Sequence, residues 1–328
     1  DESGGDDRYG YCVNQGPRVS MEDAVDAIQR MEGPVPTEFY AVYDGHSGTQ
    51  AVEFVKVRLP QALQNCSCFG DEDRVSEALQ EAFVLTDDEL LRHLQQKCAP
   101  MQQQERPEGA YVLSAGCVGC VALVRGDSLH IANLGDCRAV LCRQGEMTAL
   151  TVDHRPQDND GERERLEGLG VEVSSDGYLH GRIGVSRAFG DWAWDAGEKC
   201  KGLSCRPDVV TTEITSDAEF LLLACDGVFE KMTTREAGQI VRRRLRSAGD
   251  ARSAAEAVVK HAVKRNGLDD PETGSDNVSA VVVLFRRPEP EPERVGPPRR
   301  LFGARLSEAT AEGEPASTGA EPGPTLKS

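Results

Sequence analysis

The stretches FYAVYD (residues 39–44), FLLLACD (220–226) and DNVSAVVVLF (276–285) decide the fold of this chain, because each is an apolar, strand-like run with an aspartate at one end. Asp44 and Asp226 are each followed by glycine, a strong turn signal, so each aspartate taken alone is best explained by turn chemistry. If the three carboxylates meet at one edge of a sheet, each pair about 4 Å apart costs roughly 4 kcal/mol at an effective dielectric of 20. Such a meeting would require cations or protons, and it makes these aspartates candidate metal ligands.

The remaining segments predict a mixture of strands and helices. Other short β-branched runs bounded by Gly, Asp or Asn predict strands at residues 8–13, 116–124, 128–134, 137–143 and 208–214. Apolar residues at three- and four-residue spacing predict helices at residues 49–64, 73–95, 161–170, 234–248 and 251–267. Because the helices come in pairs rather than one after each strand, antiparallel sheets covered by helices are favoured over a doubly wound parallel fold. The chain is therefore assigned to the α+β class.

Two local signals add detail to this assignment. The pair Gly135-Asp136 separates two of the predicted strands, which indicates a tight antiparallel hairpin. Thr233 or Thr234 is predicted to cap the start of the fourth helix.

Composition limits the classes of partner. The 328 residues carry a formal net charge of -18, which argues against nucleic acid or an anionic membrane surface as the main partner but not against a phosphorylated substrate. No apolar run reaches the 18 or so residues of a membrane span, and no basic-then-apolar leader opens the sequence. The eleven scattered cysteines suit a reducing compartment. We expect a monomer in the cytoplasm or nucleus, and the question of a lipidated or longer N-terminus stays open because residue 1 is aspartate.

The ends of the sequence differ in composition from its body. Residues 1–7 (DESGGDD) are acidic and small, which predicts disorder before a folded domain of residues 8–287. Residues 288–328 are rich in Pro, Glu, Ser and Gly, which predicts a mobile tail.

Seven short motifs fall in an order and spacing that resemble the metal-dependent (type 2C) Ser/Thr protein phosphatases. They are RVSMED (18–23), VYDGHSG (42–48), NLGDCRAVLCR (133–143), DHRP (153–156), GVSRAFGD (184–191), ACDGVFE (224–230) and GSDNVS (274–279). Together they most resemble the mammalian subgroup with a C-terminal extension. The resemblance implies that residues 8–287 are a phosphatase domain. It further implies a four-layer α/β/β/α sandwich of two mainly antiparallel sheets flanked by helix pairs.

The resemblance also implies two Mn²⁺ or Mg²⁺ ions between the sheets. Asp44 would bridge both ions, and Asp226 and Asp276 would complete the site of the first. Glu22 and the backbone carbonyl of Gly45 would serve the second, partly through water. This agrees with the residues themselves, because hard divalent cations take carboxylate, carbonyl and water oxygens.

Three further acids match the family's motifs. Asp23 would act next to the ligands, and Asp136 would hold a third, weaker ion together with Asp226. Glu230 stands where relatives often have aspartate, so its longer side chain puts this third site in question.

The implied reaction is hydrolysis of phosphoserine and phosphothreonine by a metal-activated water, without a phosphoenzyme, releasing inorganic phosphate. Arg18 matches the phosphate-binding arginine, whose planar fork suits two phosphate oxygens. His46 matches the general acid that protonates the leaving serine or threonine oxygen. Arg187 would bind substrate or support the site. Without the resemblance, Arg18 would be read as a solvated surface residue and His46 as a loop residue.

One departure from the family bears on activity. Relatives usually have Gly-Ser-Thr where this chain has Gly116-Cys117-Val118, so a methyl group replaces a hydroxyl expected near the activated water. We predict a slower enzyme, because one preorganised hydrogen-bond donor can be worth about 10²-fold or more in other hydrolases. The alternative is a weak or inactive phosphatase fold that binds phosphoproteins as a scaffold.

Two cysteine patterns resemble functional motifs but are not assigned a function. Cys117 and Cys120 lie three apart on a predicted strand and so face opposite sides, which argues against a shared metal. Cys200 and Arg206 have the C-x5-R spacing of thiolate-dependent phosphatases, but their flanks lack the strand and helix that this chemistry needs.

Residues 155–207 correspond to a mobile flap beside the family's active site, which would help to choose substrates.

Overall fold

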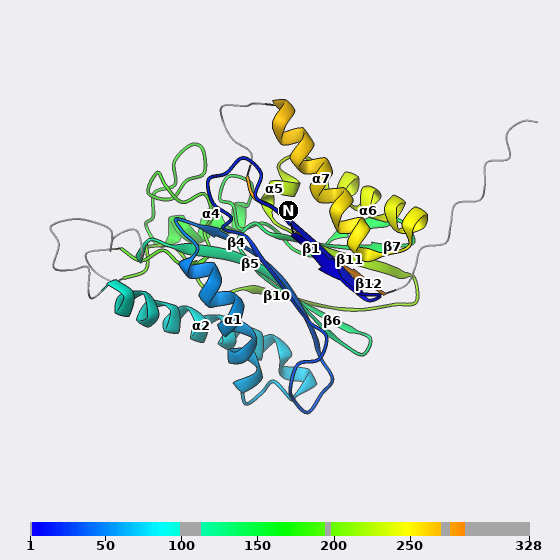
Figure 1. Ribbon diagram of the computed structural model, residues 1–328. Coiled ribbons are helices and arrows are strands. Elements are labelled where there is room, and N and C mark those ends of the chain that lie inside the picture. The colour runs from blue at the N-terminus through cyan, green and yellow to red at the C-terminus, as the bar shows by residue number, and fades with distance from the viewer. Residues whose placement is uncertain (1, 99–112, 194–197, 270–275, 286–328) are drawn as a thin grey trace, which may run out of the picture. The chain divides into compact units, whose positions relative to one another are not determined.

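The computed structural model describes residues 2–98, 113–193, 198–269 and 276–285, which form four layers of helices, sheet, sheet and helices (Figure 1). One sheet has the strand order β1-β2-β12-β11-β7-β8, and the other has the order β10-β6-β5-β4-β3. Neighbouring strands in both sheets are antiparallel. The predicted α+β sandwich is confirmed.

Most of the strands lie where the sequence predicted them, but four, at residues 2–5, 24–28, 146–149 and 189–190, were not predicted. The first sheet contains β1 (Glu2–Gly5), β2 (Tyr9–Asn14), β7 (Arg138–Arg143), β8 (Glu146–Ala149), β11 (Ala218–Ala224) and β12 (Val278–Leu284). The second contains β3 (Ala24–Ile28), β4 (Glu38–His46), β5 (Gly116–Arg125), β6 (Ser128–Leu134) and β10 (Asp208–Glu213), and the short β9 (Phe189–Gly190) pairs with β5.

Each sheet is covered on its outer face by a pair of helices. Helices α1 (Gln50–Asn65) and α2 (Val75–Cys98) pack on the second sheet, and α6 (Thr234–Ala248) and α7 (Ala251–Asp269) pack on the first. The shorter helices are η1 (Glu72–Arg74), α4 (Asp160–Gly168) and α5 (Asp226–Phe229). Helix α6 begins as predicted, because Thr233 and Glu236 form a reciprocal capping box at its N-terminus.

Three apolar layers hold the sandwich together. The central layer, between the two sheets, contains Val42 and Cys120 of the second sheet and Leu223 and Val281 of the first. Two outer layers lie between each sheet and its helices. Cys117 belongs to an outer layer, so the prediction that Cys117 and Cys120 face opposite sides of β5 is confirmed.

The predicted hairpin between residues 128–134 and 137–143 is wrong. Strand β6 pairs with β5 and β10, whereas β7 pairs with β11 and β8, so the two strands belong to different sheets. The Gly135-Asp136 turn carries the chain from one sheet to the other, and Gly135 has a positive φ of 100°. A Gly-Asp turn looks the same in the sequence whether the chain folds back into a hairpin or crosses to the other sheet. In the structure, β6 and β7 contribute side chains to the central layer from opposite sheets, so this turn is a crossing.

The N-terminal prediction also needs correction. Residues 2–5 are not disordered but form β1, which pairs with β2 in the register Glu2↔Val13 to Gly5↔Gly10. Backbone pairing does not require apolar side chains, and Ser3 Oγ adds a 2.7 Å hydrogen bond to Glu256 Oε1. The predicted tail of residues 288–328 lies outside the described residues.

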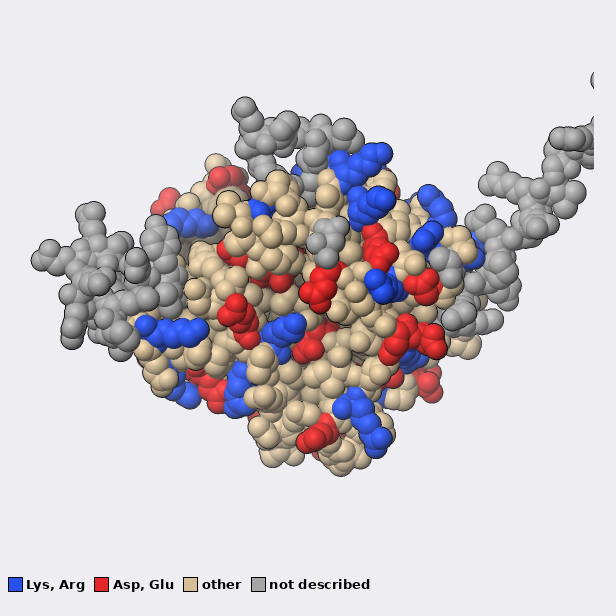
Figure 2. Space-filling model, in the orientation of Figure 1, with Lys and Arg blue, Asp and Glu red and all other residues tan. Residues whose placement is uncertain are grey.

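The surface is strongly charged but not uniformly acidic. On the face shown in Figure 2, basic and acidic side chains are interspersed. Among the described helices, we find none that is both long enough and apolar enough to cross a membrane.

Candidate active site

Four predicted acids line one cleft of about 550 Å³. Asp44 lies near the end of β4, and Asp226 is the first residue of α5, directly after β11. Asp276 lies just before β12, and Asp136 lies in the crossing between β6 and β7. The three apolar stretches that define the fold therefore bring their aspartates together, which is the condition under which the sequence makes them candidate metal ligands.

This convergence disfavours ionisation of the acids. Burial raises the pKa of Asp44 and of Asp226 well above the ordinary range, and the neighbouring carboxylates raise both further. Burial likewise raises the pKa of Asp23 to about 7. The cluster must therefore hold protons or gain cations.

The donor set fits hard divalent cations. Among the described residues, Oδ1 of Asp226 and Oδ2 of Asp23 are buried atoms without a hydrogen-bond partner. Such orphaned carboxylate oxygens are costly unless a ligand completes them. The predicted ligands offer carboxylate and carbonyl oxygens, which Mg²⁺ and Mn²⁺ prefer. The Cys225 thiol also lies within 4.8 Å of carboxylate oxygens of Asp23 and Asp44, but burial raises its pKa well above the ordinary value.

Arg155, which sequence reasoning gave no role, lies among the acids predicted for a third ion. Its Nη1 lies 3.5 Å from Asp136 Oδ2, 3.6 Å from Asp226 Oδ2 and 3.5 Å from Glu230 Oε1. The guanidinium thus supplies positive charge to all three carboxylates. The DHRP motif contained this residue, but nothing local to the motif revealed its partners.

Glu22 and Gly45 are held together by backbone and amide hydrogen bonds. Gly45 N–H donates to the Glu22 carbonyl at 3.1 Å, and a Cβ at Gly45 would lie 2.5 Å from that oxygen. The Glu22 N–H donates to Asn277 Oδ1 at 2.7 Å. Asn277 Nδ2 donates to the carbonyls of Gln15 and Ser20, so this residue fastens the N-terminal loop to the start of β12.

Arg18 lies at the mouth of the same cleft. Its Nη2 lies 2.7 Å from Asp276 Oδ2, and its side chain is 56% exposed. This exposure leaves the guanidinium within reach of a ligand in the cleft. A predicted phosphate-binding residue and a predicted metal ligand are therefore in direct contact.

His46 is paired with a carboxylate that the sequence did not reveal as its partner. His46 Nε2 lies 2.8 Å from Asp191 Oδ1, and Asp191 is only 5% exposed. Burial lowers the pKa of His46, but the Asp191 carboxylate raises it, and the net pKa lies above the ordinary value. Gly116 makes the contact possible, because a Cβ there would lie 2.3 Å from Asp191 Oδ2 and 2.5 Å from His46 Nε2.

Arg187, which was predicted to bind substrate or support the site, is engaged by two carboxylates. Its guanidinium binds Glu162 Oε1 through Nη2 at 2.6 Å and Asp208 Oδ1 through Nη1 at 2.6 Å, and its side chain is 15% exposed. Arg187 is not among the described residues that line the cleft. These ion pairs accord with the supporting role predicted for Arg187, and substrate binding by this residue stays a prediction.

The flap segment contributes a wall of the cleft. Tyr178, Arg182 and Ile183 line it together with Val118 of β5. Cys200 also lines it, but burial raises the pKa of its thiol, the opposite of what a thiolate nucleophile needs.

Comparisons with known proteins agree on one family. Residues 7–270 match the family described as Protein phosphatase 2C. The chain is 35% identical over 308 residues to Probable protein phosphatase 2C 22 of Arabidopsis thaliana, covering 90% of this chain and 72% of the relative. It is 34% identical over 284 residues to Protein phosphatase 2C 1 of Paramecium tetraurelia, covering 83% and 90% respectively.

The fold agrees with a solved structure as well. It is similar to the serine-threonine phosphatase 2C from Toxoplasma gondii with a TM-score of 0.69 and 21% identity, covering 85% of this chain and 94% of that one. The narrower likeness to a mammalian subgroup remains a prediction.

Proposed function

Because this chain belongs to the protein phosphatase 2C family, we propose that it hydrolyses phosphoserine and phosphothreonine in proteins by direct attack of water, which bound metal ions would activate. Family membership makes the chain a protein Ser/Thr phosphatase. The ligand residues, the number of ions and the roles of Arg18 and His46 belong to the proposal. The observation that carries it is the cleft in which Asp44, Asp226 and Asp276 converge.

The residues that would hold two ions are Asp44, Asp226, Asp276, Glu22 and the Gly45 carbonyl. When bound, Mn²⁺ or Mg²⁺ would supply a water of lowered pKa and offset charge on the phosphoryl oxygens. The protein contributes a rigid set of oxygen donors. Asn277 fixes the backbone of Glu22, and the Glu22 carbonyl in turn fixes Gly45.

Arg18 would orient the phosphoryl group. Its contact with Asp276 holds the guanidinium over the cleft, and its exposed donors can turn to two phosphate oxygens. His46 would protonate the leaving alkoxide. Asp191 is a positioning residue, because it holds the His46 ring and favours its protonated form.

We infer two ions rather than three. Arg155 contacts the three acids that the family resemblance assigns to a third ion, so one positive charge is already present there. A third cation would have to displace this guanidinium or bind against its repulsion.

Val118 is expected to limit turnover. It lies directly opposite Asp44 in the β4–β5 register and lines the cleft, so its side chain shares a face with the predicted bridging ligand. Val118→Thr keeps the side-chain volume and restores a hydroxyl. We expect kcat on a phosphothreonine peptide to rise, by up to about 10²-fold if the hydroxyl positions the water.

A matched control lies on the same strand. Val121 is buried in the outer apolar layer beneath the helices, so Val121→Thr should lower thermal stability without raising kcat. An unchanged or lower kcat for Val118→Thr would show that the departure from Gly-Ser-Thr does not limit this enzyme.

Metal dependence tests the proposed function directly. Wild-type protein should release inorganic phosphate from a phosphothreonine peptide with Mn²⁺ or Mg²⁺ and stop when a chelator is added. Release that persists in excess chelator would contradict the metal-activated water. Peptide binding without release under every metal condition would support the scaffold instead.

A further inference from the structure

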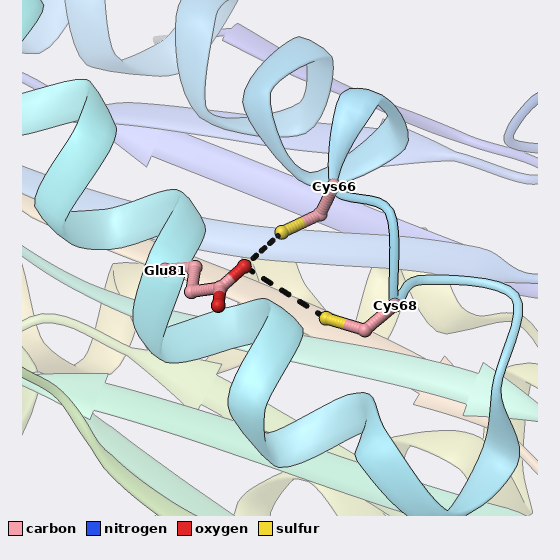
Figure 3. Close-up of side chains that lie close together, drawn as sticks. All are labelled: Cys66, Cys68 and Glu81. Carbon is pink, nitrogen blue, oxygen red and sulfur yellow. Dashed lines mark hydrogen bonds between the residues drawn. The ribbon is translucent and has the colours of Figure 1, made fainter.

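Two thiols and a carboxylate converge at the outer helix pair, on residues that the phosphatase reaction does not use. Cys66 directly follows α1, Cys68 lies two residues later, and Glu81 lies on α2 (Figure 3). In Figure 3 both sulfur atoms point toward the same carboxylate. The side chains thus connect the end of one helix to the body of its partner.

The loop that carries the thiols is fixed by its own backbone. Cys66 N–H donates to the Leu63 carbonyl at 3.1 Å, Phe69 N–H to the Cys66 carbonyl at 3.0 Å, and Asp71 N–H to the Cys68 carbonyl at 3.0 Å. These consecutive turns orient both thiols toward α2 before any ligand binds. A preformed arrangement reduces the cost of ordering that a bound ion would otherwise have to meet.

The distances suit a tetrahedral metal site. Cys66 Sγ lies 2.9 Å and Cys68 Sγ 3.8 Å from Glu81 Oε2, and the three ligand atoms all lie within 4.8 Å of one another. Bonds of about 2.3 Å to sulfur and about 2.1 Å to oxygen place tetrahedral ligand atoms roughly 3.5–3.8 Å apart. The Cys68 separation already lies near this range, and a movement of about 0.7 Å of the Cys66 thiol away from the carboxylate would bring the other sulfur–oxygen separation into it.

We propose that Cys66, Cys68 and Glu81 bind one Zn²⁺ ion, which fastens the loop after α1 to α2 at a site separate from the active-site cleft. Thiolates favour zinc over Mg²⁺ and Mn²⁺, whereas the oxygen donors of the cleft favour the latter pair. The two sites therefore select different metals.

Charge and exposure at this place support cation binding. Residues 71–81 contain five acidic side chains and one basic one. Cys68 is buried and Cys66 is half-buried, while Glu81 is exposed, so the cluster opens to solvent on one side. That side gives an ion its route of entry and leaves room for water as the fourth ligand.

Proton balance sets the pH dependence of binding. Without metal, the Cys66 thiol donates a hydrogen bond to Glu81 Oε2 at 2.9 Å. Binding replaces two thiol protons with one Zn²⁺, leaves Zn–S bonds in place of S–H bonds, and releases two protons to solvent. Affinity should consequently rise with pH.

Cobalt substitution tests the proposal without reference to catalysis. The reduced, full-length chain is freed of metal and titrated with Co²⁺, and the near-ultraviolet sulfur-to-cobalt charge-transfer band is recorded. We expect the band to saturate at one equivalent and to disappear when Zn²⁺ is added. Oxygen ligands give no such band, and a band from Cys225, whose thiol lies within 4.8 Å of carboxylate oxygens of Asp23 and Asp44, would survive replacement of Cys66 and Cys68.

Variants locate the band. Cys66→Ser and Cys68→Ser should each abolish or strongly weaken it, and Glu81→Gln, which keeps both thiols, should reduce the affinity for Co²⁺ at least tenfold. Cys142→Ala is the matched control: Cys142 also lies beside a carboxylate, that of Glu219, but Arg242 is paired with this carboxylate. The band should survive in that variant.

The result that would overturn the proposal is equally specific. A cobalt titration without a thiolate band, or a band that survives both serine variants, would show that Cys66 and Cys68 do not bind metal. If a serine variant fails to fold, alkylation mapped by mass spectrometry decides: Zn²⁺ should protect these two thiols in the wild-type chain, and unprotected thiols would refute the site. Phosphate release is measured separately and does not enter either readout.

Discussion

Asp44→Asn is expected to reduce phosphate release from a phosphothreonine peptide by about 10³-fold or more at saturating Mn²⁺. Asp44 is one of the residues that would hold both ions, and it lies in the cleft with Asp136, Asp226 and Asp276. An amide carries no negative charge, so the variant loses affinity for both cations. Metal-ion catalysis supplies several kcal/mol of transition-state stabilisation, and each 1.36 kcal/mol is worth a factor of ten in rate.

The same substitution should stabilise the metal-free protein. Burial and four neighbouring carboxylates raise the pKa of Asp44, so the folded state binds protons more tightly than the unfolded state. This contribution to stability is fully present below the ordinary aspartate pKa and is lost as pH rises toward the raised value. At neutral pH in chelator, burying Asp44 among other carboxylates destabilises the folded wild-type protein. Asp44→Asn removes this destabilisation, so the Tm of the variant should exceed the wild-type Tm.

Adding Mn²⁺ should then reverse the order of the two proteins. Wild type gains stability because the ions bind only the folded state, whereas the variant gains much less. Asp26→Asn is the control, because Asp26 is a half-buried acid on the neighbouring strand β3 whose pKa is also raised by burial. It should retain metal-dependent turnover. Wild-type turnover in Asp44→Asn would refute the proposed ligand set.

Most strands could be predicted because each is an apolar run with its own boundaries. The strand β3 (AVDAI) was missed, since it is half-buried throughout and only five residues long, so its alternation is weak. The crossing at Gly135-Asp136 was missed for another reason. Sheet membership depends on which distant strand pairs with β6 or β7, and no local pattern carries that information.

In the candidate site too, some residues could be predicted from the sequence and their long-range contacts could not. The carboxylates could be named because each terminates an apolar run or belongs to a motif. Asp191 could not be assigned as the partner of His46, from which it is 145 residues away, and Asn277 lies 255 residues from Glu22. The motif of Arg187 likewise left open whether it binds substrate or supports the site, because it could not show that Glu162 and Asp208 engage its guanidinium.

The effect of replacing His46 should depend on the leaving group. His46→Gln is expected to lower kcat on a phosphothreonine peptide by about 10²–10⁴-fold, the range typical of general acid catalysis. On an aryl phosphate with an acidic phenol the loss should be much smaller, because that leaving group departs without a proton. Equal losses on both substrates would indicate that His46 acts in binding or structure rather than as the acid.

Asp191→Asn tests, through the pH dependence of kcat/KM, whether Asp191 acts on His46 or only stabilises the fold. The carboxylate raises the pKa of His46, and a general acid works only while protonated, so activity falls as pH rises through that pKa. Replacing the carboxylate by an amide removes the effect, and the alkaline limb of kcat/KM should move to lower pH. A merely structural role would lower kcat/KM at all pH values without moving the limb. Gly116 on β5 leaves space for the contact between His46 and Asp191. A shifted limb would therefore show that this glycine serves proton delivery to the leaving oxygen by allowing the contact.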